Sequence, residues 1–104
     1  MVLVNWTLFA INDLHEIKGY IAKDSKRYAE IVVRKIYKST NILQTTPQIG
    51  RVVPEIDRVE IREIIYTNYR IIYKIVSMNR IDILTVHHTS RLMMNNKGVL
   101  QFLE

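Results

Sequence analysis

The stretch that decides the fold is EIREIIYTNYRIIYKIVSMNRIDILTVHH, residues 60–88. It is rich in Ile, Tyr and Val, and two short turn signals divide it, Thr67-Asn68 and Ser77-Met78-Asn79. Runs of β-branched and aromatic residues between short turns are typical of strands joined by hairpins. The stretch therefore predicts three antiparallel strands in a meander.

The pairing of these strands sorts their side chains by face, because successive side chains point to opposite sides of a sheet. If Thr67-Asn68 is a two-residue loop, Tyr66 lies opposite Tyr69. One face is then almost wholly apolar or aromatic and carries Ile64, Tyr66, Tyr69, Ile71, Tyr73 and Ile75. The other face is half charged and carries Ile61, Glu63, Ile65, Arg70, Ile72, Lys74 and Val76. We expect the first face to meet helices, and the second, with Arg70, to be an open concave surface.

The N-terminal half predicts a strand followed by two helices. Residues 2–6, VLVNW, read as a short strand with Trp6 in the core, and Thr7 and Ser25 are suitable helix caps. Apolar residues recur at helical spacing after each cap. The first stripe is Ala10, Leu14, Ile17 and Ile21, and the second is Ala29, Val32, Val33, Ile36, Thr40 and Leu43. Such stripes predict an antiparallel helical hairpin.

The predicted fold class is α+β: an antiparallel sheet, made of the N-terminal strand and the C-terminal meander, packed on one face by the helical hairpin. The segment TTPQIGRVVP at 45–54 contains two prolines and a glycine, so we expect a loop with at most a short edge strand. The length of 104 residues fits one domain over residues 1–104. Residues 93–104 form a C-terminal extension that either docks on the domain or awaits a partner.

The composition limits the classes of chemistry. The chain has 15 Lys and Arg against 10 Asp and Glu, a formal charge of +5, which favours a polyanionic partner. It has no cysteine, so disulfides, thiolate metal sites and cysteine nucleophiles are excluded. No apolar run reaches transmembrane length and the N-terminus lacks a signal-peptide pattern, so we expect a cytoplasmic protein without a membrane partner.

The candidate chemistry is metal-free handling of phosphate. His87 and His88 alternate in direction and show no metal-ligand spacing, so we expect no metal site, with His88 at the working surface. Arg70 could clamp a phosphate and His88 could move a proton. Glu55 could act as a base towards a 2′-hydroxyl, and Arg91 adds positive charge. These charges could equally be solvated or serve as ion-pair partners.

An ordered set of motifs carries a family resemblance. The set comprises W-x3-A-x2-DL-x2-I-x2-YIA-x-DS at 6–25, P-x2-GR-x2-PE at 47–55, IREI at 61–64, YRIIY at 69–73 and H-x2-R at 88–91. Over roughly residues 4–92 the chain resembles the RelE/ParE superfamily of type II toxin–antitoxin toxins. The resemblance implies the same α+β fold and a growth-inhibiting toxin of the kind that stabilises plasmids. It also implies a cognate antitoxin with an acidic toxin-binding segment.

The superfamily has two kinds of target, and the resemblance implies different site residues for each. RelE-like members are mRNA interferases that cut mRNA in the ribosome, and for that activity the catalytic set here is Arg70, His88, Glu55 and Arg91. ParE-like members are inhibitors of DNA gyrase and lack an evident nuclease site. In either case the target-binding residues are Arg51, Arg62, Arg70, Lys74 and Arg91, and no cofactor is implied.

The helical motif and GR-x2-PE are more similar to the ParE side, and the chain has no dense lysine cluster before the meander and no terminal tyrosine. We therefore expect a ParE-like toxin acting on gyrase or another target, with the ribosome-dependent endoribonuclease as the alternative. A non-toxic binding module on the same fold is a third reading. Under either toxin reading, Arg70→Ala should abolish toxicity and leave the fold intact.

Overall fold

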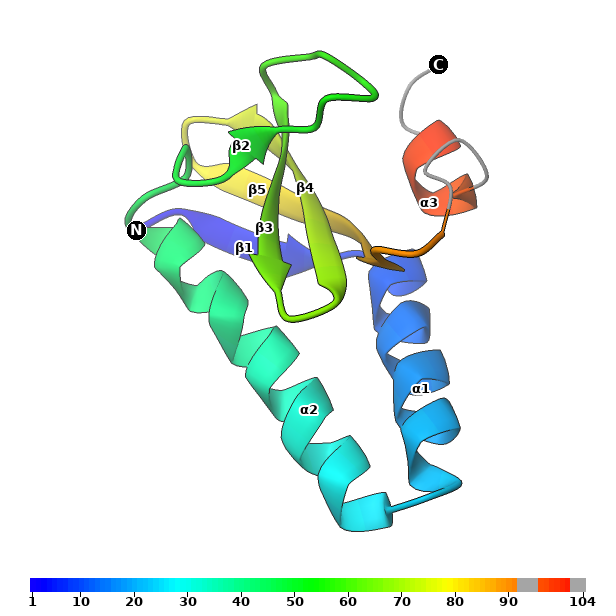
Figure 1. The fold of residues 1–104 in the computed structure, drawn as a ribbon. Helices are drawn as coiled ribbons and strands as arrows, with labels where there is room; N and C mark the ends of the chain where they lie inside the picture. The colour runs from blue at the N-terminus through cyan, green and yellow to red at the C-terminus, as the bar shows by residue number, and fades with distance from the viewer. Residues whose placement is uncertain (92–95, 102–104) are drawn as a thin grey trace.

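The protein is described by a computed structural model for residues 1–91 and 96–101. The predicted elements form a five-stranded sheet in the order β1-β5-β4-β3-β2, with the α1–α2 hairpin on one face (Figure 1). The elements are β1 Leu3–Trp6, α1 Leu8–Ala22, α2 Lys26–Ser39, the 3-10 helix η1 Thr40–Gln44, β2 Arg51–Val52, β3 Ile61–Tyr66, β4 Tyr69–Ser77, β5 Arg80–His88 and α3 Lys97–Leu100. The α+β class is confirmed.

The β3–β4 hairpin has the predicted register, whereas the β4–β5 ladder contains two register shifts, between Ile72 and Tyr73 and between Ile75 and Ser77. Tyr66 pairs with Tyr69, and Thr67 adopts a φ of 51°, the positive value that a two-residue hairpin turn needs at its first position. β2 is the expected short edge strand, with Arg51 opposite Glu63. One pairing differs from the all-antiparallel expectation, because β1 runs parallel to β5 with Leu3 opposite Arg80. The N-terminal strand and the last strand are thus neighbours.

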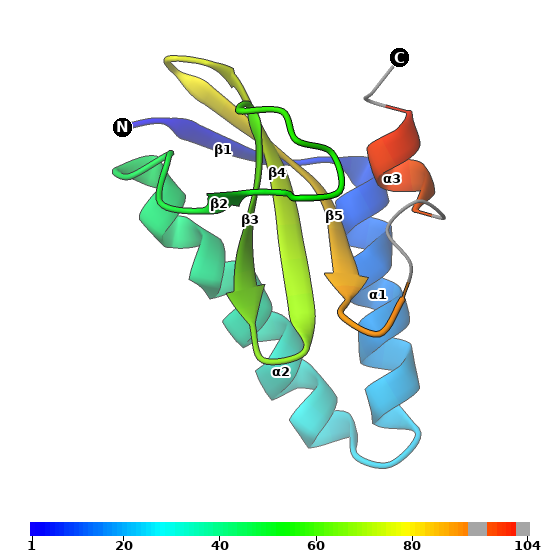
Figure 2. The same cartoon turned by 45° about the horizontal axis from the view of Figure 1, so that its top comes forward.

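Both helices begin at the predicted caps. The Thr7 hydroxyl accepts a hydrogen bond from the Ala10 amide at 3.2 Å, and the Ser25 hydroxyl accepts one from the Tyr28 amide at 3.1 Å. Each cap satisfies an amide that has no partner within the helix, which is why these residue types favour helix starts. The two helices lie alongside the meander and meet at a short turn (Figures 1 and 2).

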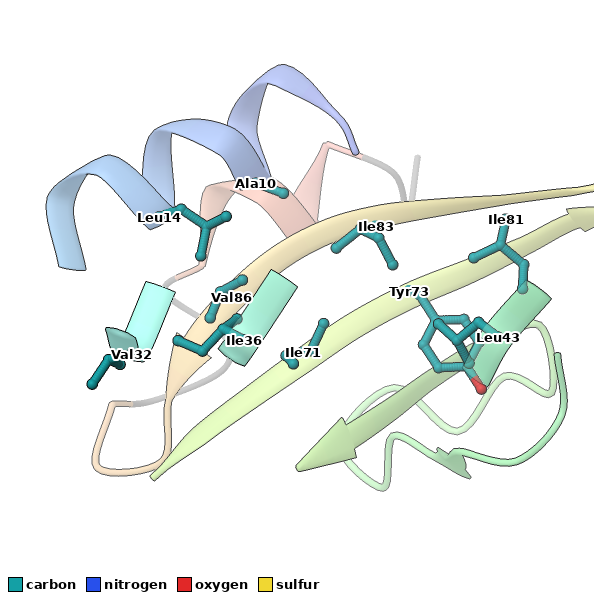
Figure 3. Close-up of a cluster of buried hydrophobic side chains, with 10 residues drawn as sticks. All are labelled: Ala10, Leu14, Val32, Ile36, Leu43, Ile71, Tyr73, Ile81, Ile83 and Val86. Carbon is teal, nitrogen blue, oxygen red and sulfur yellow. The ribbon is translucent and has the colours of Figure 1, made fainter. Parts of the chain in front are cut away.

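The main core lies between the helical hairpin and the apolar face of the sheet. Figure 3 shows side chains from α1, α2, η1, β4 and β5 converging there. The buried members are Ala10, Leu14, Val32, Ile36, Leu43, Ile71, Tyr73, Ile81, Ile83 and Val86. The other residues that the alternation assigned to this face pack against the cluster, and Trp6 joins them with its ring stacked on Tyr37 at 5.3 Å. The predicted helix-facing side of the sheet is confirmed.

The opposite face is not the open surface that we expected. A second apolar cluster lies on it, in which Ile61, Ile72 and Leu84 of the sheet are buried together with Val53 and Val99. The connection between β2 and β3 contributes Val53, and the C-terminal helix α3 contributes Val99. Arg70 is therefore buried, with 9% of its surface exposed, because this covering segment closes over β4. The half-charged pattern did not mean an open face.

The C-terminal segment docks on the domain as far as it is described. Asn96 caps α3 by accepting from the Val99 amide at 3.1 Å. A side chain at Gly98 would overlap the Phe9 ring, since an added Cβ would lie 2.6 Å from its Cε1 atom. Figures 1 and 2 both place α3 beside the start of α1. Of the extension at 93–104, residues 93–95 and 102–104 lie outside the described residues.

Candidate functional site

Arg70 lies at the centre of an ion cluster in which Arg70 and Glu63 are buried and the other two members are exposed. Its Nη1 and Nη2 donate to the two carboxylate oxygens of Glu55 at 2.5 and 2.8 Å. Its Nε and Nη2 donate to Glu63, the latter at 3.1 Å. Arg51 also donates to Glu63, at 2.7 Å, from the edge strand. We call these four residues, Arg51, Glu55, Glu63 and Arg70, the Arg70 cluster. Two guanidinium groups and two carboxylates give it no formal net charge.

Strand geometry explains why the cluster forms. Arg70 pairs with Ile65 across β3 and β4, so Glu63 lies two residues away on the same face. The Glu63 side chain has no exposed surface, and a carboxylate in such a place needs a partner with a fixed geometry. The planar guanidinium of Arg70 supplies one, with paired donors on two edges. Within the described part of the chain, no buried side-chain nitrogen or oxygen lacks a hydrogen-bond partner.

The ion pair changes the chemistry of Glu55. The hydrogen bond from Arg70 lowers the pKa of this carboxyl from its ordinary 4.5 to about 2. A carboxylate with so low a pKa has little tendency to take a proton from a hydroxyl near neutral pH. The guanidinium donors of Arg70 are likewise committed to carboxylates. A phosphate would have to displace Glu55 to reach them.

His88 lies on the other face of the sheet from Arg70. It pairs with Tyr69, whereas Arg70 pairs with His87, so His88 points to the helix side. It lines a pocket of about 490 Å³ between α1 and the ends of β4 and β5. The lining residues are Asp13, Glu16, Ile17, Tyr20, Tyr69, Val86, His88, Ser90 and Arg91. The His88 Nδ1 accepts from the Ser90 amide at 3.1 Å, and its ring stands edge-on to Tyr69.

His87 is a structural residue in a buried hydrogen-bond network. It is 3% exposed, its Nδ1 accepts from the Asn96 side-chain amide at 2.9 Å, and its Nε2 donates to the Arg91 carbonyl at 2.8 Å. Asn96 also donates to Thr85 at 3.1 Å, and the Thr85 hydroxyl donates to Asp13. Burial raises the pKa of Asp13. The network ties α1, β5 and the N-terminus of α3 together.

The structure therefore divides the predicted catalytic set. Arg70 and Glu55 are joined on one face, while His88 and Arg91 line the pocket on the helix side. The predicted target-binding set is divided as well. Arg51 and Arg91 are exposed, Lys74 is half-buried, and Arg62 is half-buried with its guanidinium donating to the Gly50 and Val59 carbonyls at 3.0 Å. These side chains do not form one continuous basic surface.

Glu63 is the participant that sequence reasoning missed. The alternation had already placed Glu63 and Arg70 on one face, and a buried carboxylate two positions from a cross-strand arginine is a recognisable pairing signal. The half-charged pattern hides this signal, because it predicts an open face.

Among the described residues, no group of three or more His, Cys, Asp or Glu could hold a metal ion. The described helices also lack the combination of length and hydrophobicity that a membrane span requires.

Comparisons with known proteins identify the family. A family model described as the ParE toxin of type II toxin-antitoxin system, parDE, matches residues 4–93. Among solved structures, a chain described as the chromosomal ParDE TA system from P. aeruginosa matches with a TM-score of 0.70 and 21% sequence identity. That match covers 85% of this chain and 96% of the other, and at this identity it supports the fold. No curated protein matches the chain. Because the family match spans most of the sequence, the chain belongs to the ParE toxin family of type II toxin–antitoxin systems.

Proposed function

We propose that this toxin inhibits growth by binding a macromolecular target, DNA gyrase, and not by cutting RNA. The observation that supports this most directly is the division of the catalytic set between the two faces of the sheet. Metal-free RNA cleavage requires a base, a phosphate clamp and an acid within reach of one phosphodiester. Here the clamp and the base are bonded to each other, and the acid candidate is on the far side of β4.

Membership of the ParE family supports this choice, because the resemblance to ParE-like toxins implies action on gyrase and not on mRNA. The motifs in the helical hairpin and at 47–55 are also those that favour the gyrase-directed branch over the ribonuclease branch. The surface charge suits a target that carries or holds nucleic acid, since the formal net charge is +5. Action on gyrase takes place in the cytoplasm, where we place the protein.

A cognate antitoxin is the second partner that we propose. The chain belongs to a family of toxins that occur with an antitoxin, and its positive charge suits a partner with an acidic toxin-binding segment. A short neighbouring reading frame with an acidic C-terminal half would identify it. Co-expression of that frame should restore growth, and the two proteins should co-purify.

Three assays on purified protein and induced cells test the proposal. Induction should arrest growth, and the purified toxin should inhibit gyrase supercoiling of plasmid DNA. Translating ribosomes with the toxin added should yield intact mRNA. Cut mRNA would favour the ribonuclease instead, and growth without arrest would favour a non-toxic binding module. The matched control is the same preparation incubated with its antitoxin, which should lose the effect on supercoiling.

A further inference from the structure

The outer face of α2 carries most of the net positive charge of the protein. The helix has five basic residues and one acidic residue, a net of +4 out of the chain's formal +5. The basic residues are Lys26, Arg27, Arg34, Lys35 and Lys38, and all five are exposed. Across residues 1–91 and 96–101, none of the five lies within ion-pair distance of a carboxylate.

The arginines of the sheet and of the β2–β3 connection differ in this respect. Those that form ion pairs are Arg51, Arg58, Arg70 and Arg80, each bonded to a Glu or Asp. Their charge is thereby largely neutralised inside the domain. The positive charge available to a partner is therefore concentrated on α2, and not on the sheet face where the sequence predicted it.

Three of the α2 cations lie in one row along the helix. With 3.6 residues per turn, Arg27, Arg34 and Lys38 fall within roughly 40° of one another around the helix axis, over a length of roughly 16 Å. Lys35 lies beside them, and we call these four residues the basic ridge. The buried residues of α2, Ala29, Val32 and Ile36, lie on the opposite side, and Val32 and Ile36 belong to the main core. Figures 1 and 2 show α2 along the outside of the molecule. All four residues of the ridge are exposed, so the ridge faces solvent.

The chemistry of the ridge fits a nucleic-acid backbone better than a protein. The centre of a protein–protein interface is depleted of charge and rich in apolar side chains, whereas protein–DNA interfaces are much more positively charged. The ridge is composed of cations, and the exposed rings of Tyr28 and Tyr37 lie to its two sides. A length of 16 Å of duplex DNA presents about nine phosphate charges, enough to engage all four cations.

We propose that the basic ridge of α2 binds the phosphate backbone of duplex DNA. The choice of DNA over RNA rests on the proposed gyrase target, which holds a DNA duplex while it works. Contacts of this kind are independent of base sequence and position the protein on the duplex. The ridge would hold the toxin against the DNA that gyrase has bound and leave the pocket around His88 free.

Fluorescence anisotropy with a labelled short duplex tests the ridge without gyrase. Four phosphate contacts give a slope of log affinity against log salt of about −3.6, measured between about 50 and 200 mM salt. The variant R27Q/R34Q/K38Q should weaken binding by at least about tenfold and make the slope shallower by about 2.7, because three contacts are lost. The charge-preserving variant R27K/R34K/K38R should keep both values.

The matched control is K18Q/K23Q/K97Q, which removes three charges from exposed positions outside the ridge. It should keep most of the affinity. Equal losses in the two neutralised variants, or no binding by the wild type, would overturn the proposal. Tighter binding to an acidic peptide than to DNA, abolished in the ridge variant, would assign the ridge to an acidic protein segment and overturn it too. Circular dichroism would confirm that each variant is folded.

A supercoiling assay separates this inference from the proposed function. If the wild-type toxin inhibits gyrase and the ridge variant inhibits it equally well, the ridge proposal fails and the gyrase target stands. If the wild type binds DNA through the ridge but leaves gyrase unaffected, the gyrase target fails and the ridge remains a DNA-binding surface. A ridge variant with a much weaker effect on gyrase supports both.

Discussion

The two faces of the sheet bury their residues by different means. The helix-side face is covered by the helical hairpin and is almost entirely apolar. The opposite face is covered by the β2–β3 connection and α3, and it encloses the Arg70 cluster beside a smaller apolar cluster. Apolar residues therefore indicate a covered face reliably, whereas charged residues do not indicate an open one, because opposite charges can pair and be buried together.

The largest predicted loss of stability concerns two isoleucines of β4 that are neighbours in sequence but lie on the two different faces of the sheet. Ile71 and Ile72 are both fully buried, but on opposite faces. We expect Ile71→Ala to lower the free energy of unfolding by about 4 kcal/mol and Ile72→Ala by about 2 kcal/mol, since a loop can collapse into a cavity better than two packed helices can. Urea denaturation measures both. A larger loss for Ile72→Ala would mean that the face covered by the β2–β3 connection tolerates a cavity less well than the helix-side face.

Removing Arg70 tests whether the charged face is a structural element. Arg70→Ala leaves the buried Glu63 carboxylate without its main partner, so we expect a loss of about 3 kcal/mol. This replaces the expectation from sequence that the variant would lose toxicity with its fold intact. Arg51→Ala is the matched control; its side chain is 60% exposed, so we expect at most about 1 kcal/mol. Thermal unfolding followed by circular dichroism compares the two.

A double variant sharpens the test of the cluster. Replacing Arg70 and Glu63 together by Met and Leu removes both buried charges, so most of the stability lost in Arg70→Ala should return. If the double variant is as unstable as the single one, the loss comes from packing and not from an unpaired charge. The same urea titration gives the answer.

The helix α3 buries part of the sheet face that carries the Arg70 cluster, through Val99. Gly98→Ala would place a methyl group against the Phe9 ring, so we expect a loss of about 1–2 kcal/mol from overpacking. Hydrogen exchange should show faster exchange at Val99 and Leu100 amides, with the protection of β4 amides retained. Unchanged exchange at α3 would mean that the helix contributes little to this face.

The smallest predicted effect is a pH dependence at Glu55. Its pKa is about 2 in the folded protein against an ordinary 4.5, so the ionised form favours folding. The contribution is present above about pH 4.5 and is lost as the pH falls towards 2. Because the side chain is 44% exposed, we expect Glu55→Gln to cost about 1 kcal/mol or less at pH 6, a difference that vanishes near pH 2. Melting temperatures across this pH range test it.

The sequence predicted the fold more completely than the site. Hydrophobic spacing, the Thr7 and Ser25 caps and the Thr67-Asn68 turn are local signals, and each produced the expected element. The parallel β1–β5 pairing depends on where the helical hairpin returns the chain, which no local pattern records. The burial of Arg70 depends on residues 53–60 and on α3. Residues 53–60 form no strand or helix, so their sequence shows no hydrophobic periodicity from which this cover could be predicted.

The placement of the site residues failed for a related reason. Alternation assigns side chains to faces only where a ladder is regular. The β4–β5 ladder has a register shift between Ile72 and Tyr73, and beyond it His88 lies opposite Tyr69, on the helix side and away from Arg70. No local pattern records such a shift. The low pKa of Glu55 could not be predicted at all, because it depends on the close approach of a loop carboxylate to a strand arginine.

The neighbouring positions of β1 and β5 affect when the toxin can become active during its synthesis. Leu3 bonds to a strand that begins 77 residues later in the chain, with Asn5 donating to Asp82 at 3.1 Å. Ribosomes release the N-terminal end of a protein first, so β1 must wait for its partner until β5 has emerged. Translation products that stop before β5 therefore lack a complete sheet, and the cell encounters a folded toxin only after β5 has been synthesised. An antitoxin translated alongside gains that interval in which to accumulate.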